Sequence, residues 1–262
     1  MPRIFLPVSL ATDATVVLSA PAIRHVQALR LKPGDALELF NGRDDADWPG
    51  EIVEVGRHRV IVRVGAPVAV ARELDDEVTL ALGVPANDRM DALVEKAGEL
   101  GAAAIQPLVC ARSVLRLAGE RAEARRRHWQ AVAAAASEQC GRARVATLLP
   151  IAALAQWLRS ADVAAASVRI VLSFDRSALA PERALAARDA SSAGVRSRIV
   201  VLSGPEGGLA PAEEDAAVDH GFVRVGLGAR VLRADTAPLA WLGWLGLRSL
   251  GGGGGGGRGD RR

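Results

Sequence analysis

The pattern of apolar residues changes near residue 72, and this change constrains the fold more than any other feature of the chain. Up to that point, short apolar runs of the length of β-strands are separated by turn residues. Beyond it, segments with helical periodicity alternate with short apolar runs, which is typical of an α/β domain with a mainly parallel sheet. The chain is therefore predicted to have an α/β fold with two domains, residues 1–72 and 73–250, joined near the polar and acidic residues 69–76.

The first part has the pattern of a small antiparallel β-barrel. Its predicted strands are residues 4–6, 36–40, 51–55 and 60–64. Turns are predicted at KPGD, residues 32–35, and at NG, residues 41–42, because proline presets φ and glycine accepts a positive φ.

The second part has longer elements. Its predicted strands are residues 78–84, 104–109, 168–174, 198–203 and 223–227. Helices are predicted from the N-cap Asn87 to Gly101, over residues 118–139, from Pro211 to Gly221, and over residues 236–250. Seven glycines from Gly251, followed by RGDRR, cannot build a core, so residues 251–262 are predicted to be a disordered tail.

Composition excludes several classes of protein. Of the 262 residues, 50% are hydrophobic and 24% are charged, which is typical of a globular protein and not of a fibre. The longest apolar stretches, residues 131–136 and 238–247, are shorter than the ~20 residues that cross a bilayer, and the N-terminal sequence MPRIFLPVSL has no secretory signal. We therefore expect a cytoplasmic protein in which Cys110 and Cys140 are reduced, and no metal site.

Basic charge is concentrated in one segment. Residues 112–144 contain eight arginines and three glutamates, which leaves an excess of five positive charges. Such an excess attracts a polyanion such as nucleic acid. The alternative is a helix face that is merely solvated.

Two glycine-rich segments each follow an apolar strand, VLSGPEGG at residues 201–208 and VGLGARVLR at residues 225–233. Ligands bind at the carboxyl ends of neighbouring strands in open α/β sheets, and glycine lets the backbone approach a ligand closely. Neither segment has the spacing of a nucleotide-phosphate loop. They therefore predict a pocket for an uncharged or cationic adenosine compound, with plain left-handed turns as the alternative.

The order of several segments resembles the ribosomal small subunit methyltransferase E family, the 16S rRNA uridine-N3 methyltransferases. The segments that carry the resemblance are PRIFLP at residues 2–7, HVQALR at 25–30, PGD at 33–35, FNG at 40–42, KAGELG at 96–101, QPL at 106–108, RS at 112–113, SEQCGR at 137–142, GPEGG at 204–208, LGARVLR at 227–233 and DTA at 235–237. The last three are the most specific. The chain departs from the family pattern at Gly98, Leu209, Ala229 and Asp235, and residues 148–196 match least.

The resemblance implies a PUA-like, RNA-binding N-terminal barrel and a SPOUT-class catalytic domain whose C-terminal loops form a trefoil knot around S-adenosylmethionine. It also implies a homodimer that methylates N3 of a uridine in 16S rRNA of the small ribosomal subunit. The residues expected to bind the cofactor are Leu172, Phe174, Ser203, Gly204, Pro205, Glu206, Gly207, Leu227, Gly228, Arg230, Val231, Leu232, Arg233 and Thr236.

The reaction favours arginines in the catalytic site. The N3 proton of uridine must leave as the nitrogen attacks the methyl group, and a cation near the uracil oxygens would stabilise the developing negative charge. The candidates are Arg112, Arg142, Arg230 and Arg233.

A general base would be Glu138 or Glu99. Glu138 could instead pair with Arg142 four residues on, and Glu99 could simply face solvent. His128 is expected to be structural or to face RNA. The residues expected to bind RNA are Arg3, Arg24, His25, Arg30, Arg125, Arg126 and Arg127.

Two other functions are compatible with the same residues. One is a SPOUT methyltransferase with a different RNA target, since the pocket motifs do not name the base. The other is a non-catalytic RNA-binding protein of ribosome assembly. Both would bind RNA, but only an enzyme should bind S-adenosylmethionine productively.

Overall fold

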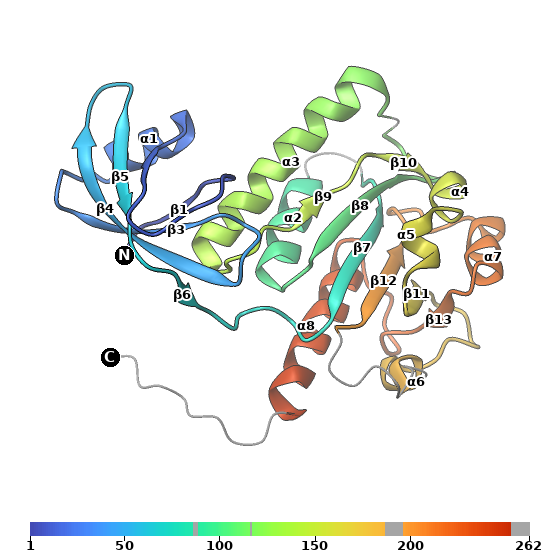
Figure 1. Cartoon of the computed structure of the whole chain (residues 1–262). Coiled ribbons are helices and arrows are strands. Elements are labelled where there is room, and N and C mark those ends of the chain that lie inside the picture. Colours follow the sequence, from blue (N-terminus) through green and yellow to red (C-terminus); the bar gives the residue numbers. More distant parts are fainter. Residues whose placement is uncertain (86–88, 116, 187–195, 253–262) are drawn as a thin grey trace. The chain divides into compact units, whose positions relative to one another are not determined.

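The computed structural model describes residues 1–85, 89–115, 117–186 and 196–252 (Figure 1). The chain divides into two compact units. The first contains Met1–Glu73 and Ala131–Val145, and the second contains Leu74–Gln130 and Ala146–Arg262. Helix α3, Gly119–Cys140, is therefore shared between the units. The predicted N-cap Asn87 lies outside the described residues.

The first unit is built on a six-stranded sheet. Its elements are β1 (Arg3–Phe5), β2 (Thr15–Val17), α1 (Ala20–Ala28), β3 (Ala36–Phe40), β4 (Ala46–Val55), β5 (Val60–Val64) and β6 (Val68–Ala69). The strand order is β1-β3-β4-β5-β2, and β6 pairs with β4. The core contains aliphatic side chains of the strands together with Ile23 and Val26 of α1.

The structure corrects the sequence prediction for this unit in two respects. Strand β1 runs parallel to β3, with Arg3 opposite Glu38, so the sheet is not wholly antiparallel. A parallel pair needs a long crossover, and the chain between β1 and β3 supplies it with β2 and α1. Helix α1 was not predicted, although Ser19 caps it by accepting a hydrogen bond from the Ala22 amide.

The segment Ala131–Val145 belongs to the first unit because polar contacts attach it to the barrel strands. The Phe5 amide donates to Glu138 Oε1 at 2.8 Å, and Arg144 pairs with Asp45 at 2.6 Å. Gly42 and Arg144 also form an isolated parallel β-bridge.

The second unit is a parallel α/β layer structure, as predicted. Its strands are β7 (Glu77–Gly83), β8 (Ala104–Val109), β9 (Thr147–Leu148), β10 (Ala152–Ala153), β11 (Val168–Leu172), β12 (Arg198–Ser203) and β13 (Val223–Val225). Every pairing among them is parallel, in the order β10-β8-β7-β12-β11-β13, with β9 beside β8.

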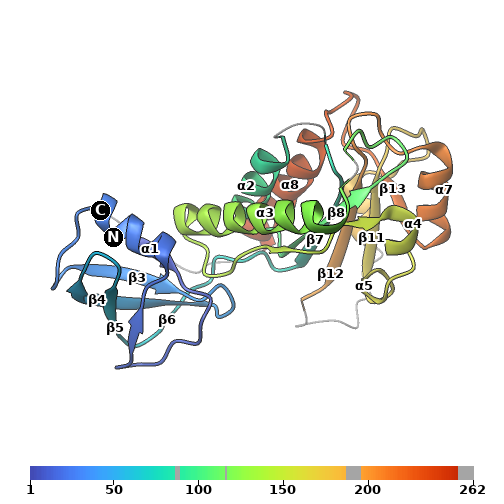
Figure 2. The ribbon, with the colours of Figure 1, turned by 90° about the horizontal axis from the view of Figure 1, so that it is seen from above.

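Helices cover both faces of this sheet (Figure 2). Helices α2 (Arg89–Glu99) and α8 (Thr236–Gly252) lie on one face, and α4 (Leu154–Trp157), α5 (Ala161–Ala164) and α7 (Pro211–Asp219) lie on the other. A further short helix, α6, covers Pro181–Ala186. None of the helices in the described ranges is long and apolar enough to cross a membrane.

Predicted helix ends agree with the structure where the signal is glycine. Gly101 has a φ of 96°, and the Ala102 amide donates to the Ala97 carbonyl at 2.9 Å, which closes the end of α2. At the other extreme, Gly251 and Gly252 continue α8, so the helix extends two residues into the predicted disordered tail. The rest of that tail, residues 253–262, lies outside the described residues.

A candidate cofactor pocket at the ends of three parallel strands

A cavity of about 890 Å³ lies in the second unit, at the carboxyl ends of β11, β12 and β13. Three segments supply most of its lining: the loop after β11, the loop after β12 and the chain from Val225 to the start of α8. These strands are neighbours in a parallel sheet, so the residues that follow them converge at one edge. The volume is in the range of cavities that hold a cofactor-sized ligand.

Most residues predicted to bind the cofactor line this cavity. Gly228 and Thr236 are not among the lining residues. Gly228 instead has a φ of 95° and shapes the turn after β13, while Thr236 is the first residue of α8.

Two glycines allow the loop after β12 to fold tightly. A Cβ at Gly204 would lie 2.6 Å from the Leu209 amide nitrogen, and a Cβ at Gly83 would lie 2.4 Å from Pro205 Cδ. Both distances are shorter than real Cβ contacts, so only glycine fits without movement of the backbone. Gly83 was not predicted as a site residue, although a glycine that ends a buried strand is a signal of close backbone approach.

The Arg112 guanidinium holds the same loop. Its Nη1 donates to the carbonyl oxygens of Gly207 at 2.8 Å and Leu209 at 3.2 Å. Arg112 lines the cavity and these contacts hold the loop, while its catalytic role stays a prediction.

Arg230 and Arg233 also line the cavity, and both side chains are exposed. Neither forms an ion pair with any residue that the structure describes, and the neighbouring acids Asp235 and Glu206 do not pair with Arg233. The Arg233 carbonyl accepts hydrogen bonds from the first amides of α8. Because the Arg233 guanidinium has no partner among the described residues, it is available to a ligand.

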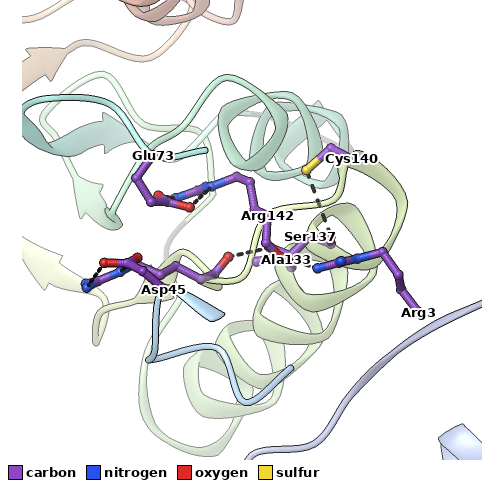
Figure 3. A network of polar contacts seen from close by, with 8 residues as sticks. Arg3, Asp45, Glu73, Ala133, Ser137, Cys140 and Arg142 are labelled. Atoms are coloured by element: carbon purple, nitrogen blue, oxygen red, sulfur yellow. Dashed lines mark hydrogen bonds and ion pairs between the residues drawn. The ribbon is translucent and has the colours of Figure 1, made fainter. Parts of the chain in front are cut away.

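Arg142 and Glu138 do not line the cavity of this chain, and their catalytic role stays a prediction. The buried Arg142 guanidinium pairs with Glu73, with Nε 3.0 Å from Oε1 (Figure 3). Figure 3 also shows Arg3 reaching the Arg142 carbonyl, at 3.1 Å. Glu138 accepts the Phe5 amide hydrogen bond described above. These side chains stabilise the first unit.

The other candidate base, Glu99, lies on α2 and accepts a hydrogen bond from Lys96 Nζ at 2.8 Å. Lys96 also contacts Glu95, and the two carboxylates raise the pKa of the Lys96 ammonium. Glu99 does not line the cavity. Glu99 therefore forms an ion pair where the alternative was a side chain that simply faces solvent, and its role as a base stays a prediction.

Sequence reasoning missed a charged network in the cavity wall. Ser173 Oγ donates to Glu214 Oε1 at 2.7 Å, and Arg224 Nε donates to the same oxygen at 2.7 Å. Arg224 Nη2 reaches Asp215 Oδ1 at 2.6 Å. The hydrogen bond to Glu214 is the main reason why the pKa of Arg224 is raised. The network joins the loop after β11 to α7 and β13, segments far apart in the sequence.

The predicted RNA-binding residues fall into two groups. Arg3 is held by Glu38 and by Asp47, with Nη1 2.9 Å from Asp47 Oδ1, and its side chain is only 12% exposed. Its guanidinium is therefore engaged within the first unit, and its RNA contact stays a prediction. Arg24 and Arg30 are exposed, and His25 is partly exposed.

On α3, Arg125 and Arg127 are exposed and unpaired among the described residues. Arg126 instead pairs with Glu123 at 2.9 Å and reaches the Leu148 carbonyl at 3.4 Å. The adjacent His128 contacts Asp91 at 2.6 Å.

The protein combines a parallel α/β unit that contains a glycine-lined pocket with a small β-rich unit. This combination is that of an RNA methyltransferase with a PUA domain. The family model for an RNA methyltransferase domain matches residues 72–246, and that for an RNA methyltransferase PUA domain matches residues 18–65. The chain belongs to the ribosomal RNA small subunit methyltransferase E family, which confirms the resemblance found in the sequence.

Individual relatives of this family align with the chain over most of their length. The ribosomal RNA small subunit methyltransferase E of Bacillus subtilis is 30% identical, over 86% of this chain and 87% of the relative. The enzyme of that name from Neisseria gonorrhoeae, solved with S-adenosylmethionine bound, is 32% identical, with a TM-score of 0.81 over 94% of this chain and 96% of that one. A Legionella pneumophila methyltransferase, also solved with S-adenosylmethionine, is 29% identical, with a TM-score of 0.83 over 94% and 97%.

Proposed function

We propose that this protein transfers the methyl group of S-adenosylmethionine to N3 of a uridine in the 16S rRNA of the small ribosomal subunit. The observation that carries this proposal is the cavity at the ends of β11, β12 and β13, which combines both glycine-rich segments with two unpaired arginines. Family membership supports the reaction class and the substrate.

The residues of the cavity fit the cofactor. Backbone groups of residues 203–209 form a tight, glycine-dependent loop that can approach an adenosine, and Leu172, Leu227 and Leu232 supply apolar surface beside it. When bound, S-adenosylmethionine supplies the methyl group from its sulfonium. After the transfer, the cofactor is S-adenosylhomocysteine. The chain's own contribution is to orient that methyl group towards the uridine nitrogen and to exclude water.

The two unpaired arginines suit the charge that develops on the substrate. As the N3 proton leaves, negative charge spreads to the uracil oxygens, and we assign Arg233 to stabilise it, with Arg230 beside it. The nearby guanidiniums also lower the pKa of the N3–H group, so the proton can pass to a solvent water and this assignment does not require Glu138 or Glu99 as a base.

RNA binding is assigned to exposed basic residues in both units. Arg24 and Arg30 serve on the first unit, and Arg125 and Arg127 serve on α3. These exposed guanidiniums suit phosphate groups, which they can bind in a bidentate manner.

We further propose a homodimer. Phe174 and Val231 line the cavity and are 65% and 81% exposed, and large apolar groups at a site are commonly covered by a partner. Family membership also supports a trefoil knot in the segments around the cavity. Because the substrate is rRNA, we place the reaction in the cytoplasm.

The decisive experiment compares nucleosides of 16S rRNA from a strain that lacks the gene with those from the complemented strain, by mass spectrometry. We expect N3-methyluridine to disappear from one position and to return on addition of purified protein and S-adenosylmethionine. A different missing methylated nucleoside would indicate a different RNA target. An unchanged profile would indicate a non-catalytic role and would refute the proposal.

A further inference from the structure

Glu213, in the first turn of α7, joins two segments that lie far apart in the sequence. Its Oε1 accepts a hydrogen bond from the Ala111 amide, 102 residues away, at 2.7 Å. Its Oε2 accepts from the Ala210 amide at 2.9 Å. Ala111 lies in the turn after β8, and Ala210 lies between the loop after β12 and α7. Each oxygen of this carboxylate therefore holds a different segment at the same edge of the sheet.

Arg112 joins the same two segments in the opposite direction. It follows Ala111 in the turn after β8, and its guanidinium donates to the carbonyl oxygens of Gly207 and Leu209. Its side chain also packs on the loop, since a Cβ at Gly207 would lie 3.2 Å from Arg112 Cβ. Together with the two bonds of Glu213, these contacts close a ring of hydrogen bonds through residues 111–112 and 207–213. We call it the Arg112–Glu213 ring.

The turn between β8 and Arg112 is itself held firmly. The Cys110 amide donates to Ser113 Oγ at 3.0 Å, the Ser113 amide donates to the Cys110 carbonyl at 3.0 Å, and both residues are buried. Burial is the main reason why the pKa of the Cys110 thiol is raised, and the negative charge of Glu213 adds to it. Because the turn is braced in this way, the position of the Ala111 amide determines where the Arg112 side chain begins.

We infer that Glu213 is a positioning residue for cofactor binding, which acts by fixing Arg112 on the loop after β12. Arg112 lines the cavity and Glu213 does not, so Glu213 influences a ligand there through the Arg112–Glu213 ring. The ring sets the positions of residues 207–209, which form part of the cavity wall. This inference deepens the proposed function and rests on it for the assignment of this loop to S-adenosylmethionine.

A capping role alone does not account for both bonds of Glu213. A glutamate three residues after the N-cap commonly accepts from the N-cap amide, here that of Ala210, and glutamine can do the same. The bond to the Ala111 amide is not needed to begin the helix. Glutamine has one acceptor oxygen, and its amide nitrogen only donates. Glu213→Gln can therefore keep the cap of α7, but it leaves the Ala111 amide facing another donor.

A double-mutant cycle tests whether Glu213 acts through Arg112. The dissociation constant of S-adenosylmethionine is measured by calorimetry for Glu213→Gln, for Arg112→Ala and for the double variant. We expect Glu213→Gln to weaken binding about 10-fold, which corresponds to the loss of one hydrogen bond to a charged group. In the Arg112→Ala background the same substitution should cause little further loss, because two residues that act as one unit are not additive.

Steady-state kinetics separate positioning from a purely structural role. Glu213→Gln should raise the KM for S-adenosylmethionine with little change in kcat, since the reacting groups are left in place. Asp219→Asn is the matched control, because it removes the same charge from the exposed end of the same helix, where Asp219 forms no ion pair with a described residue. Its cofactor affinity should equal that of the unmodified protein.

Three results would overturn the inference. They are an unchanged cofactor affinity in Glu213→Gln, an equal loss from this substitution with and without Arg112, and a lower melting temperature without any change in KM. The unmodified protein is assayed alongside for binding of S-adenosylmethionine and for methylation of 16S rRNA. A failure of the proposed function would appear in that protein, whereas a failure of this inference would appear only in the variants.

Discussion

Substituting Gly204 by alanine tests how the loop after β12 holds the cofactor. The new Cβ would lie 2.6 Å from the Leu209 amide nitrogen and 2.8 Å from the Gly208 carbonyl carbon. Both are backbone atoms, so no side chain can move aside. An ordinary contact begins at 3.4 Å, and the loop must therefore shift by about 0.8 Å.

A displacement of this size has two expected consequences. Overpacking typically costs ~1–3 kcal/mol of folding free energy, of which alanine recovers ~0.4–1 kcal/mol by restricting the unfolded chain. Misplacement of a binding loop by ~1 Å can cost ~10²-fold in function. We expect Gly204→Ala to remain folded, with a modestly lower melting temperature and an affinity for S-adenosylmethionine lower by ~10- to ~100-fold.

Calorimetric titration with S-adenosylmethionine and a thermal unfolding curve measure the two effects. Gly243→Ala on α8 is the matched control, because no atom lies within 4 Å of the added Cβ and alanine favours a helix. Gly207→Val should lower the affinity for S-adenosylmethionine less than Gly204→Ala does. The nearest neighbour of the added Cβ is the Arg112 side chain, at 3.2 Å, and a side chain can move aside more easily than backbone. Unchanged cofactor affinity in Gly204→Ala would refute the assignment of this loop to the cofactor.

Four further outcomes are expected. Arg233→Ala should lower kcat by ~10²- to ~10³-fold with little change in cofactor affinity, whereas a parallel loss of thermal stability would assign Arg233 to the fold. Arg125→Ala with Arg127→Ala should weaken binding to rRNA and reduce its salt dependence, and unchanged binding would identify this face as merely solvated. Glu214→Gln should lower cofactor affinity in calorimetry more than Asp215→Asn, because the Glu214 side chain is 23% exposed and that of Asp215 is 70% exposed. Burial raises the pKa of the Cys110 thiol to about 12, so alkylation at pH 9 followed by mass spectrometry should label it only after unfolding.

The Cys110 thiol also gives a pH dependence of stability. Its pKa in the folded protein is above its ordinary value of about 9, so the folded state binds the proton more tightly. The contribution of the thiol to stability is therefore complete below pH 9 and declines as the pH rises towards 12.

Local patterns in the sequence determined the elements that form the pocket. The apolar runs that end near Leu172, Ser203 and Val225 became strands β11, β12 and β13, and the glycines that follow two of them line or shape the cavity. Such features depend on neighbouring residues, through side-chain periodicity and the permitted φ and ψ angles of glycine, so they can be predicted from the sequence.

The tertiary structure alone decided which charged residues are available to ligands. The sequence alone does not distinguish Arg142 from Arg233. Each is the last residue of a segment that carries the family resemblance, SEQCGR for Arg142 and LGARVLR for Arg233. Yet Arg142 is buried against Glu73, 69 residues away, while Arg233 stays exposed at the cavity.

The same holds for Glu214, which meets both Ser173 and Arg224 only because β11 lies between β12 and β13. Ion pairing and desolvation depend on distances between residues that strand order and register bring together, and these are properties of the whole fold. The sequence therefore determined where the pocket forms, and the packing of the chain determined which side chains remain free to act in it.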